Sequence, residues 1–326
     1  MKKLSLGLIA ALFLTSCATT LKVPVERPAE LDMHGAKTIS ILPVIASSGN
    51  VDSYESSAII KFFSWLSTDS RETRCANRIT DEITLRVLNS GFFTVVPAST
   101  VQTCLKNGEQ PPVDAYISAT ISNFSVTQKD DSYSREENGV RVYYTEYHDN
   151  VSLTLSYLII DAKTNNVIAI KQRTFDNNSD RYKDKYRRPE PVTVLESSIK
   201  AFGAQILKEL QPYTVTKSIK LEADKTKDPE MKAADQLAKA GNYDQALEQF
   251  TKIYSSTNNF AAGYNAGMIL LAQEKYDEAL EVMQNLASVT GDKKAIKAVN
   301  DITIEKYQKQ RLLEQKNARE ANIDEK

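Results

Sequence analysis

Few residues of this chain have the types and spacings that catalysis or metal binding requires. The sequence contains two histidines, His34 and His148. Neither lies at a metal-ligand spacing, and a zinc site would need further ligands that are absent. Two histidines also leave few candidates for a general base. We therefore expect both to be solvated or capping residues, and we expect no metal and no cofactor.

Two short segments share part of a catalytic or phosphate-binding signature. Residues 35–38 (GAKT) are similar to the end of a phosphate loop, but the upstream glycine is missing and a strand follows instead of a helix. Residues 197–200 (SSIK) match S-x-x-K without the companion motifs of that enzyme class. The sequence has neither a glycine-rich dinucleotide fingerprint nor a G-x-S-x-G elbow. It therefore predicts a protein that is not an enzyme.

Cys17 is the residue whose surroundings predict a chemical modification. Lys2 and Lys3 are followed by an apolar stretch over residues 4–14, which is shorter than the ~20 residues of a membrane-spanning helix. Residues 1–16 are thus predicted to be a secretory signal peptide. Residues 14–17 (LTSC) resemble the bacterial lipobox, in which the cysteine is acylated and becomes the mature N-terminus. The alternative is an ordinary signal peptide that ends near a cysteine.

Acylation of Cys17 would fix the protein to a membrane. Each buried methylene contributes ~0.8 kcal/mol, so three acyl chains, palmitate among them, anchor a protein permanently. The residue after the cysteine is Ala18 and not aspartate. A residue other than aspartate at this position resembles the signal for export to the outer membrane in lipoproteins of two-membrane bacteria. The resemblance implies a lipid-anchored protein of the bacterial cell envelope, on the outer membrane and facing the periplasm. Residues 17–36 have little apolar periodicity and are expected to be a lipidated tether that can reach ~60 Å.

The charge balance excludes one class of partner. The chain has 41 Lys and Arg against 42 Asp and Glu. Without Lys2 and Lys3 the mature protein has 39 against 42, a net charge of −3. Nucleic acid is therefore not an expected partner, because no basic excess is available to neutralise phosphates.

Cys75 and Cys104 are the cysteines left after Cys17. In an oxidising compartment this pair could form a disulfide, which would stabilise the fold by roughly 3 kcal/mol. Alternatively, each is a small buried apolar residue. Cys75 begins an apolar stripe at helical spacing that continues through Ile79, Ile83 and Val87, which supports the second interpretation.

Strand and helix patterns alternate between residues 37 and 220, which predicts an α/β domain with a mixed sheet covered by helices. We expect strands over residues 38–45, 92–96, 115–126, 151–159 and 167–175. Helices are expected over residues 71–89, 99–105 and 192–210. Residues 130–138 and 176–191 are highly charged and are expected to be loops.

The rest of the chain is predicted to be helical and repetitive. After a charged linker over residues 221–229, residues 241–247 (GNYDQAL) recur as 274–280 (EKYDEAL). Ala246 and Ala279 are 33 residues apart, close to the tetratricopeptide period of 34. The sequence thus predicts two tetratricopeptide repeats over residues 230–291. A capping helix over 292–318 and a polar tail over 319–326 follow.

Two surfaces are candidates for binding a protein partner. Tyr264, Met268 and Leu271 lie on the side of a repeat helix that would face a partner groove. With two repeats the groove is short, so these residues could instead contact the capping helix. The apolar segment 58–66 (AIIKFFSWL) contains the single tryptophan and is either a docking patch or a short helix packed on the core.

The α/β part resembles the CsgG-like family of curli production, assembly and transport lipoproteins. The features that match in order are the lipobox, the strand at 39–44, the segment 85–93 (LRVLNSGFF), the segment 114–121 (DAYISATI) and the hairpin around 158–170. The resemblance implies an envelope domain that assembles with partners, as a homo-oligomer or with other proteins. We expect a non-catalytic adaptor whose repeats capture an envelope protein. The alternative is a subunit of a CsgG-like outer-membrane secretion channel.

Overall fold

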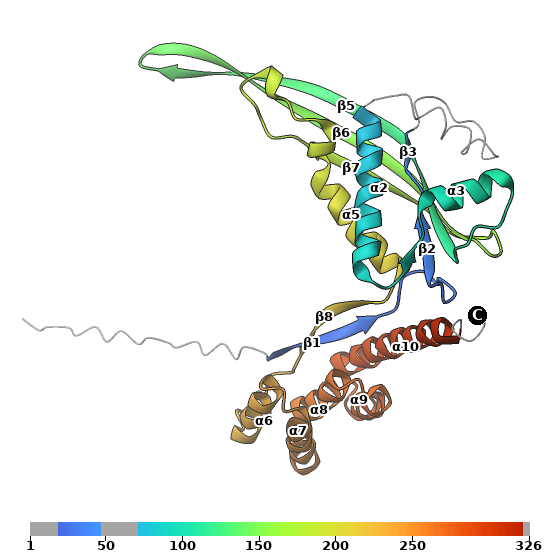
Figure 1. The fold of residues 1–326 in the computed structure, drawn as a ribbon. Helices are drawn as coiled ribbons and strands as arrows, with labels where there is room; N and C mark the ends of the chain where they lie inside the picture. Colours follow the sequence, from blue (N-terminus) through green and yellow to red (C-terminus); the bar gives the residue numbers. More distant parts are fainter. Residues whose placement is uncertain (1–18, 47–70, 322–326) are drawn as a thin grey trace, which may run out of the picture. The chain divides into compact units, whose positions relative to one another are not determined.

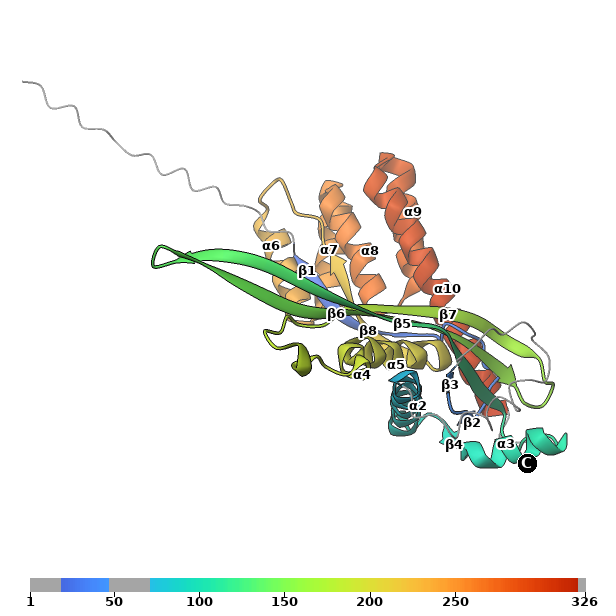
Figure 2. The ribbon, with the colours of Figure 1, turned by 90° about the horizontal axis from the view of Figure 1, so that it is seen from above.

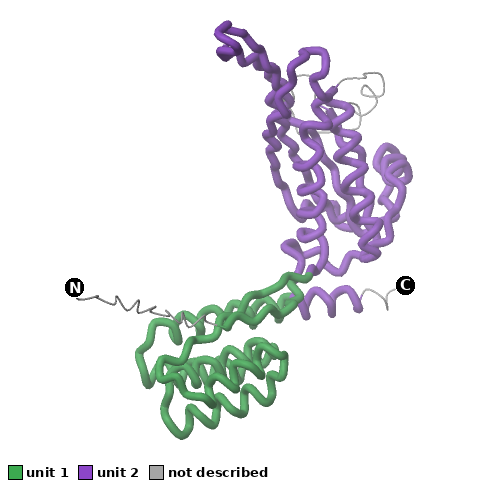
Figure 3. Tube along the Cα trace, turned by 90° about the vertical axis from the view of Figure 1, so that its left-hand side faces the viewer, with its two compact units in different colours: residues 1–27, 214–311 green, residues 28–213, 312–326 purple. Residues whose placement is uncertain are grey.

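The computed structural model describes residues 19–46 and 71–321, which form two compact units (Figure 3). Unit 1 comprises residues 1–27 and 214–311, and unit 2 comprises residues 28–213 and 312–326. The N-terminal part has mixed α/β structure with a mixed sheet, and the C-terminal part is helical, as the sequence predicts. Each unit is described separately below.

Unit 2 is built on one mixed sheet (Figure 1). Its strand order is β4-β2-β5-β6-β7, with β3 paired to β5. Strands β2, β3 and β4 are short and parallel to their neighbours, whereas β5, β6 and β7 form antiparallel hairpins. The strands are β2 (Thr38–Ile41), β3 (Ile45–Ala46), β4 (Thr94–Val95), β5 (Ala115–Glu137), β6 (Val140–Asp161) and β7 (Val167–Asn178).

Helices cover both faces of this sheet to different extents. The apolar side chains of α2 (Arg71–Ser90) and α5 (Glu196–Leu210) pack with every second residue of β5 and β6 to form the main core. On the opposite face, α3 (Ala98–Asn107) covers a small cluster around Tyr116. Two short helices, η1 (Lys185–Arg187) and α4 (Pro191–Val194), precede α5.

The β5–β6 hairpin extends beyond the helices of unit 2 (Figures 1 and 2). We call its outer part, from the pair Gln128↔Asp149 to the pair Glu137↔Val140, the ribbon. Asn138 and Gly139 form its two-residue turn, with φ of 52° and 77°. Positive φ at both positions is typical of a type I′ turn, whose twist matches that of the two strands.

In its described residues, unit 1 combines a two-stranded sheet with five helices. Strand β1 (Thr20–Arg27) pairs with β8 (Tyr213–Lys220), and side chains of both strands join the core of the helices. The helices are α6 (Pro229–Lys239), α7 (Tyr243–Thr257), α8 (Phe260–Ala272), α9 (Tyr276–Thr290) and the part of α10 (Lys293–Ala321) up to Arg311. Ala246 and Ala279 are both fully buried, and their small side chains allow the helices to pack closely.

The structure differs from the expected tether. From Thr20 onward the chain is strand β1, in which Leu21 and Val25 are buried. Leu21, Val23 and Val25 alternate as a strand requires, but Pro24 made the segment look irregular. Proline is tolerated at position 24 because Pro24 is exposed and because β1 pairs with a single strand, β8.

Several other expected boundaries need correction. Residues 130–137 are strand and not loop, and the expected strand over 38–45 is interrupted at Pro43. The expected linker over 221–229 begins with the buried Leu221. The expected polar tail begins inside α10, where the Arg319 guanidinium lies 3.9 Å from the ring centroid of Phe92, both in unit 2.

Candidate protein-binding surfaces

The ribbon has open backbone edges. Within the described part of the chain, β5 has no strand partner besides β6 after Ile121, because β3 pairs only as far as that residue. On the other side, β7 pairs with β6 as far as Asn150. Unpaired N–H and C=O groups along a strand edge are a template for a further strand. The ribbon therefore offers two edges to which an extended segment could add.

Arg188 holds the two strands of the ribbon together at its base. Its guanidinium forms ion pairs with Asp149 on β6 and Asp130 on β5. The Arg188 side chain is 12% exposed and that of Asp149 is 5% exposed. A charge-assisted pair that is this well shielded needs a fixed geometry. The base of the ribbon is therefore cross-linked by ion pairs to both of its strands.

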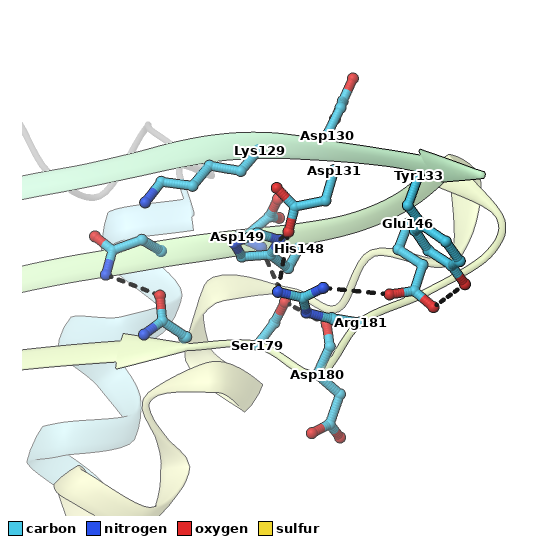
Figure 4. A network of polar contacts seen from close by, with 12 residues as sticks. Lys129, Asp130, Asp131, Tyr133, Glu146, His148, Asp149, Ser179, Asp180 and Arg181 are labelled. Carbon is cyan, nitrogen blue, oxygen red and sulfur yellow. Dashed lines mark hydrogen bonds and ion pairs between the residues drawn. The ribbon is translucent and has the colours of Figure 1, made fainter. Parts of the chain in front are cut away.

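A second polar network lies along the same strands (Figure 4). Arg181 places its guanidinium nitrogens 3.1 Å from Asp131 and 3.4 Å from Glu146. The hydroxyl of Tyr133 donates to the other oxygen of Glu146 at 3.0 Å. The hydrogen bond from Tyr133, together with Arg181, holds the pKa of Glu146 below its ordinary value. This carboxylate thus stays charged and couples the two strands through side chains.

The segment after β7 covers part of one edge of the ribbon. Tyr147 and Tyr182 exchange two backbone hydrogen bonds, each of 2.8 Å. Ser179 binds the backbone of Asp149 through both its amide and its hydroxyl. In the described residues this edge of β6 is therefore occupied at its base, and it is open from Val140 to Glu146.

Aromatic and apolar side chains project near the tip of the ribbon. Tyr143 is 76% exposed and Val140 is 63% exposed. On the face opposite Tyr143, Tyr133 and Tyr144 stack with their ring centroids 5.5 Å apart. Tyrosine is enriched in protein interfaces because it combines an apolar ring with a polar end. The tip thus has both main-chain and side-chain means of contacting a protein.

The residues predicted to line a partner groove lie in the core of unit 1. Leu271 is buried, and Tyr264 and Met268 are half-buried in the core cluster that also contains Ala298 and Ile302 of α10. Burial raises the pKa of Tyr264, with smaller contributions from Glu222 and from Asp292 and Asp301, which flank or belong to α10. All three residues thus belong to the core of unit 1, and their assignment to a partner groove stays a prediction.

The two cysteines do not form the disulfide considered from the sequence. Cys75 and Cys104 are free thiols. Cys75 is fully buried in the core on α2, and this burial raises the pKa of its thiol to about 12. Cys104 is half-buried on α3. Cys75 therefore has the alternative role, that of a small apolar core residue.

Other predicted features lie outside the described residues or have no site there. Cys17 and the apolar segment 58–66 are not among the residues that the structure describes. Within the described ranges, no helix is long and apolar enough to cross a membrane, and no group of three or more potential ligands could hold a metal ion. His34 is exposed, whereas His148 is 14% exposed with its Nδ1 3.5 Å from Asp131.

Comparison with known proteins does not assign the chain to a family. No family model matches it, and no curated protein matches it either. Among solved structures, the chain is similar to the hypothetical protein CT253 of Chlamydia trachomatis, with 10% identity and a TM-score of 0.30 over 53% of this chain and 97% of the other. For lipoprotein GNA1162 of Neisseria meningitidis, the identity is 11% and the TM-score 0.24, over 52% and 98% of the two chains.

A third similar structure is a minor lipoprotein of Acinetobacter baumannii. Its identity to this chain is 8% and the TM-score is 0.26, over 53% of this chain and 91% of the other. The similarity to these three proteins thus extends over about half of the present chain.

Proposed function

We propose that this chain is a lipid-anchored protein of the bacterial cell envelope that acts by binding other proteins, without catalysis. The open-edged ribbon is the observation that carries this proposal. Acylation of Cys17, anchoring on the outer membrane and kinship to the CsgG-like family are parts of the same proposal. They rest on the lipobox-like residues 14–17 and the order of sequence motifs.

The ribbon supports a binding role because its two backbone edges can each accept a strand of another chain. Main-chain hydrogen bonds then supply affinity, and alternate side chains supply specificity. The Arg188 and Arg181 networks fix the strands in advance, which lowers the entropy lost on binding. The partner strand is contributed by a second copy of the protein or by another envelope protein.

The helical unit contributes a scaffold in this proposal. We propose that α6–α9 are two tetratricopeptide repeats, since the related segments at residues 243–247 and 276–280 both begin the second helix of a helical pair. Because Tyr264, Met268 and Leu271 belong to the core cluster of unit 1, we assign partner binding to the ribbon and not to the repeats.

Shortening the ribbon tests the binding role. In the variant, residues 129–137 and 140–148 are removed, so that Asn138 and Gly139 connect Gln128 directly to Asp149. Gln128 and Asp149 are register partners in the intact hairpin, so the sheet of unit 2 should be retained. A photo-crosslinking residue at Tyr143 in intact cells should yield a discrete adduct in the full-length protein. The same residue at Lys252, which is exposed on α7, serves as the control position.

The expected result is an adduct from position 143 and none from position 252, together with loss of co-purifying protein from the shortened variant. An unchanged set of bound proteins in the shortened variant would refute the binding role of the ribbon. Ring-shaped particles that conduct ions in planar bilayers would instead favour the channel function. Acylation is checked separately, because a Cys17→Ser variant should lose both the lipid mass and its partition into membranes.

A further inference from the structure

The chain is fixed in the fold almost immediately after the acylation position. Thr19 is 5% exposed, and its carbonyl oxygen accepts a hydrogen bond of 2.8 Å from the amide of Leu221. Its hydroxyl donates to Asp235 of α6 at 3.4 Å. Strand β1 starts at the next residue, and the N-terminal end of this strand lies beside α6 (Figure 1). Unit 1 thus holds the chain from Thr19 onward.

Covalent geometry limits how far unit 1 can lie from a bilayer that holds the lipid. Two Cα–Cα steps separate Thr19 from Cys17, which corresponds to at most about 7 Å of extended chain. The headgroup layer on each side of a bilayer is itself roughly 5–7 Å thick. Acyl chains on Cys17 therefore bring the Thr19 end of unit 1 to the level of the lipid headgroups.

The loop that follows Leu221 gives this end an uneven charge. Its acidic residues are engaged inside unit 1: Glu222 pairs with Lys294 at 2.6 Å, and the side chain of Asp228 accepts from the first turn of α6. Asp224 accepts hydrogen bonds from Asn259 and from two backbone amides of the loop.

The basic residues of the same loop point outward. Lys225 and Lys227 are exposed, and neither forms an ion pair with any residue that the structure describes. Lys227 has a φ of 61°, in the left-handed region, so the backbone turns sharply at this position. The loop thus presents positive charge on its surface while its negative charges face inward.

We propose that the Thr19 end of unit 1, with Lys225 and Lys227, lies directly against an anionic lipid surface. This inference rests on the proposed acylation of Cys17. The occupant of the surface is a bilayer with anionic headgroups, because lysines near such a surface are attracted to it through the negative surface potential. The short connection from Cys17 supplies the proximity, and the two lysines set the orientation.

Lysine acetylation by a membrane-impermeant reagent tests the contact. The acylated full-length protein is placed on vesicles of phosphatidylcholine and phosphatidylglycerol, and the Cys17→Ser protein in solution is the reference. Lys225 and Lys227 should react about fivefold more slowly on the vesicles, the factor that corresponds to the attraction of one lysine to an anionic surface. Lys275, beyond the opposite end of α8, should react at the same rate in both samples.

A linker variant separates contact from anchoring. Twenty Gly and Ser residues inserted between Ala18 and Thr19 add a flexible reach of about 25 Å while leaving Cys17 acylated. Lys225 and Lys227 of this variant should react as fast as in solution. Equal rates for the native and linker proteins on vesicles would overturn the inference while leaving the anchoring intact. Absence of lipid mass on Cys17 would overturn the proposed anchoring and this inference with it. Equal slowing on phosphatidylcholine alone would overturn the role of the two lysines.

Discussion

Arg188 and Asp149 form an ion pair between the segment that follows β7 and the base of strand β6. The two residues are 39 positions apart in the sequence, and both side chains are largely shielded from water. The pair thus fixes where the ribbon leaves the sheet.

Arg188→Ala is expected to destabilise the protein by about 3–5 kcal/mol, because it leaves the Asp149 carboxylate buried without its partner. Urea unfolding followed by far-UV circular dichroism measures the change. The double variant Arg188→Met, Asp149→Leu removes both charges and should recover most of the lost stability. Equal stability of the single and double variants would show that the pair does not hold the ribbon.

The carboxylate of Asp114 is expected to make stability fall in acid. Burial alone would raise its pKa, but hydrogen bonds from the amides of Lys37 and Thr38, the Thr38 hydroxyl and Lys163 lower the pKa from 3.8 to about 2. A folded-state pKa below the unfolded value means that the stabilisation is complete above pH 4 and disappears between pH 4 and pH 2. The expected contribution is about 2 kcal/mol.

Unfolding free energies measured from pH 7 to pH 2 check this dependence in the wild type and in Asp114→Asn. The variant should be less stable at pH 7, and its stability should fall less steeply below pH 4. A parallel pH dependence in the two proteins would contradict the assignment to Asp114. Asp224, whose pKa is also lowered to about 2, contributes to the slope in both proteins and so cancels in the comparison.

Two glycines of α8 should respond differently to alanine. A Cβ on Gly263 would lie 2.8 Å from the ring of Tyr254, whereas a Cβ on Gly267 would lie 2.7 Å from the terminal methyl of Met283. A methionine end can move, but a tyrosine ring close to its backbone cannot move as easily. We expect Gly263→Ala to cost about 1–3 kcal/mol. Gly267→Ala should cost less, and thermal unfolding of the two variants in parallel measures the difference.

Leu271→Ala tests whether the predicted groove residues are structural. Leu271 is 5% exposed, so its truncation should cost about 2–5 kcal/mol. Met268→Ala, on the same helix but half-buried, should cost less. If Leu271→Ala leaves the unfolding midpoint in urea unchanged while abolishing partner binding, the residue belongs to a groove after all.

Local periodicity predicted the elements that have one strongly apolar side. The expected helix over residues 71–89 agrees with α2 to within a residue, because Cys75, Ile79, Ile83 and Val87 all lie on the buried face. The helix expected over 192–210 is divided at Leu195 into α4 and α5, although its apolar positions are buried as predicted.

The ribbon was not predicted because neither of its faces is consistently apolar. Strand prediction depends on burial of one face. The ribbon residues of β5 are charged or carry polar groups, and β6 adds the apolar Val140 and Val142 to a stretch that is otherwise charged, polar or tyrosine. The dipeptide Asn138-Gly139 between Glu137 and Val140 was the available signal for a hairpin.

The residues of the Arg188 and Arg181 networks could not be found from the sequence either. Arg188, Arg181 and their acidic partners are 35 to 58 positions apart, and no motif spacing links them. Such long-range pairs depend on strand register, which is set by the whole sheet.

The pairing of β1 with β8 has a consequence for the order in which the molecule matures. Residues 28–212 are synthesised between the two strands, so they can collapse into a core of their own before β8 is available to pair with β1. The helices that complete unit 1 are synthesised last. Thr19 is therefore fixed only after nearly all of the chain has emerged, and a truncated product that ends before residue 213 would leave strand β1 unpaired.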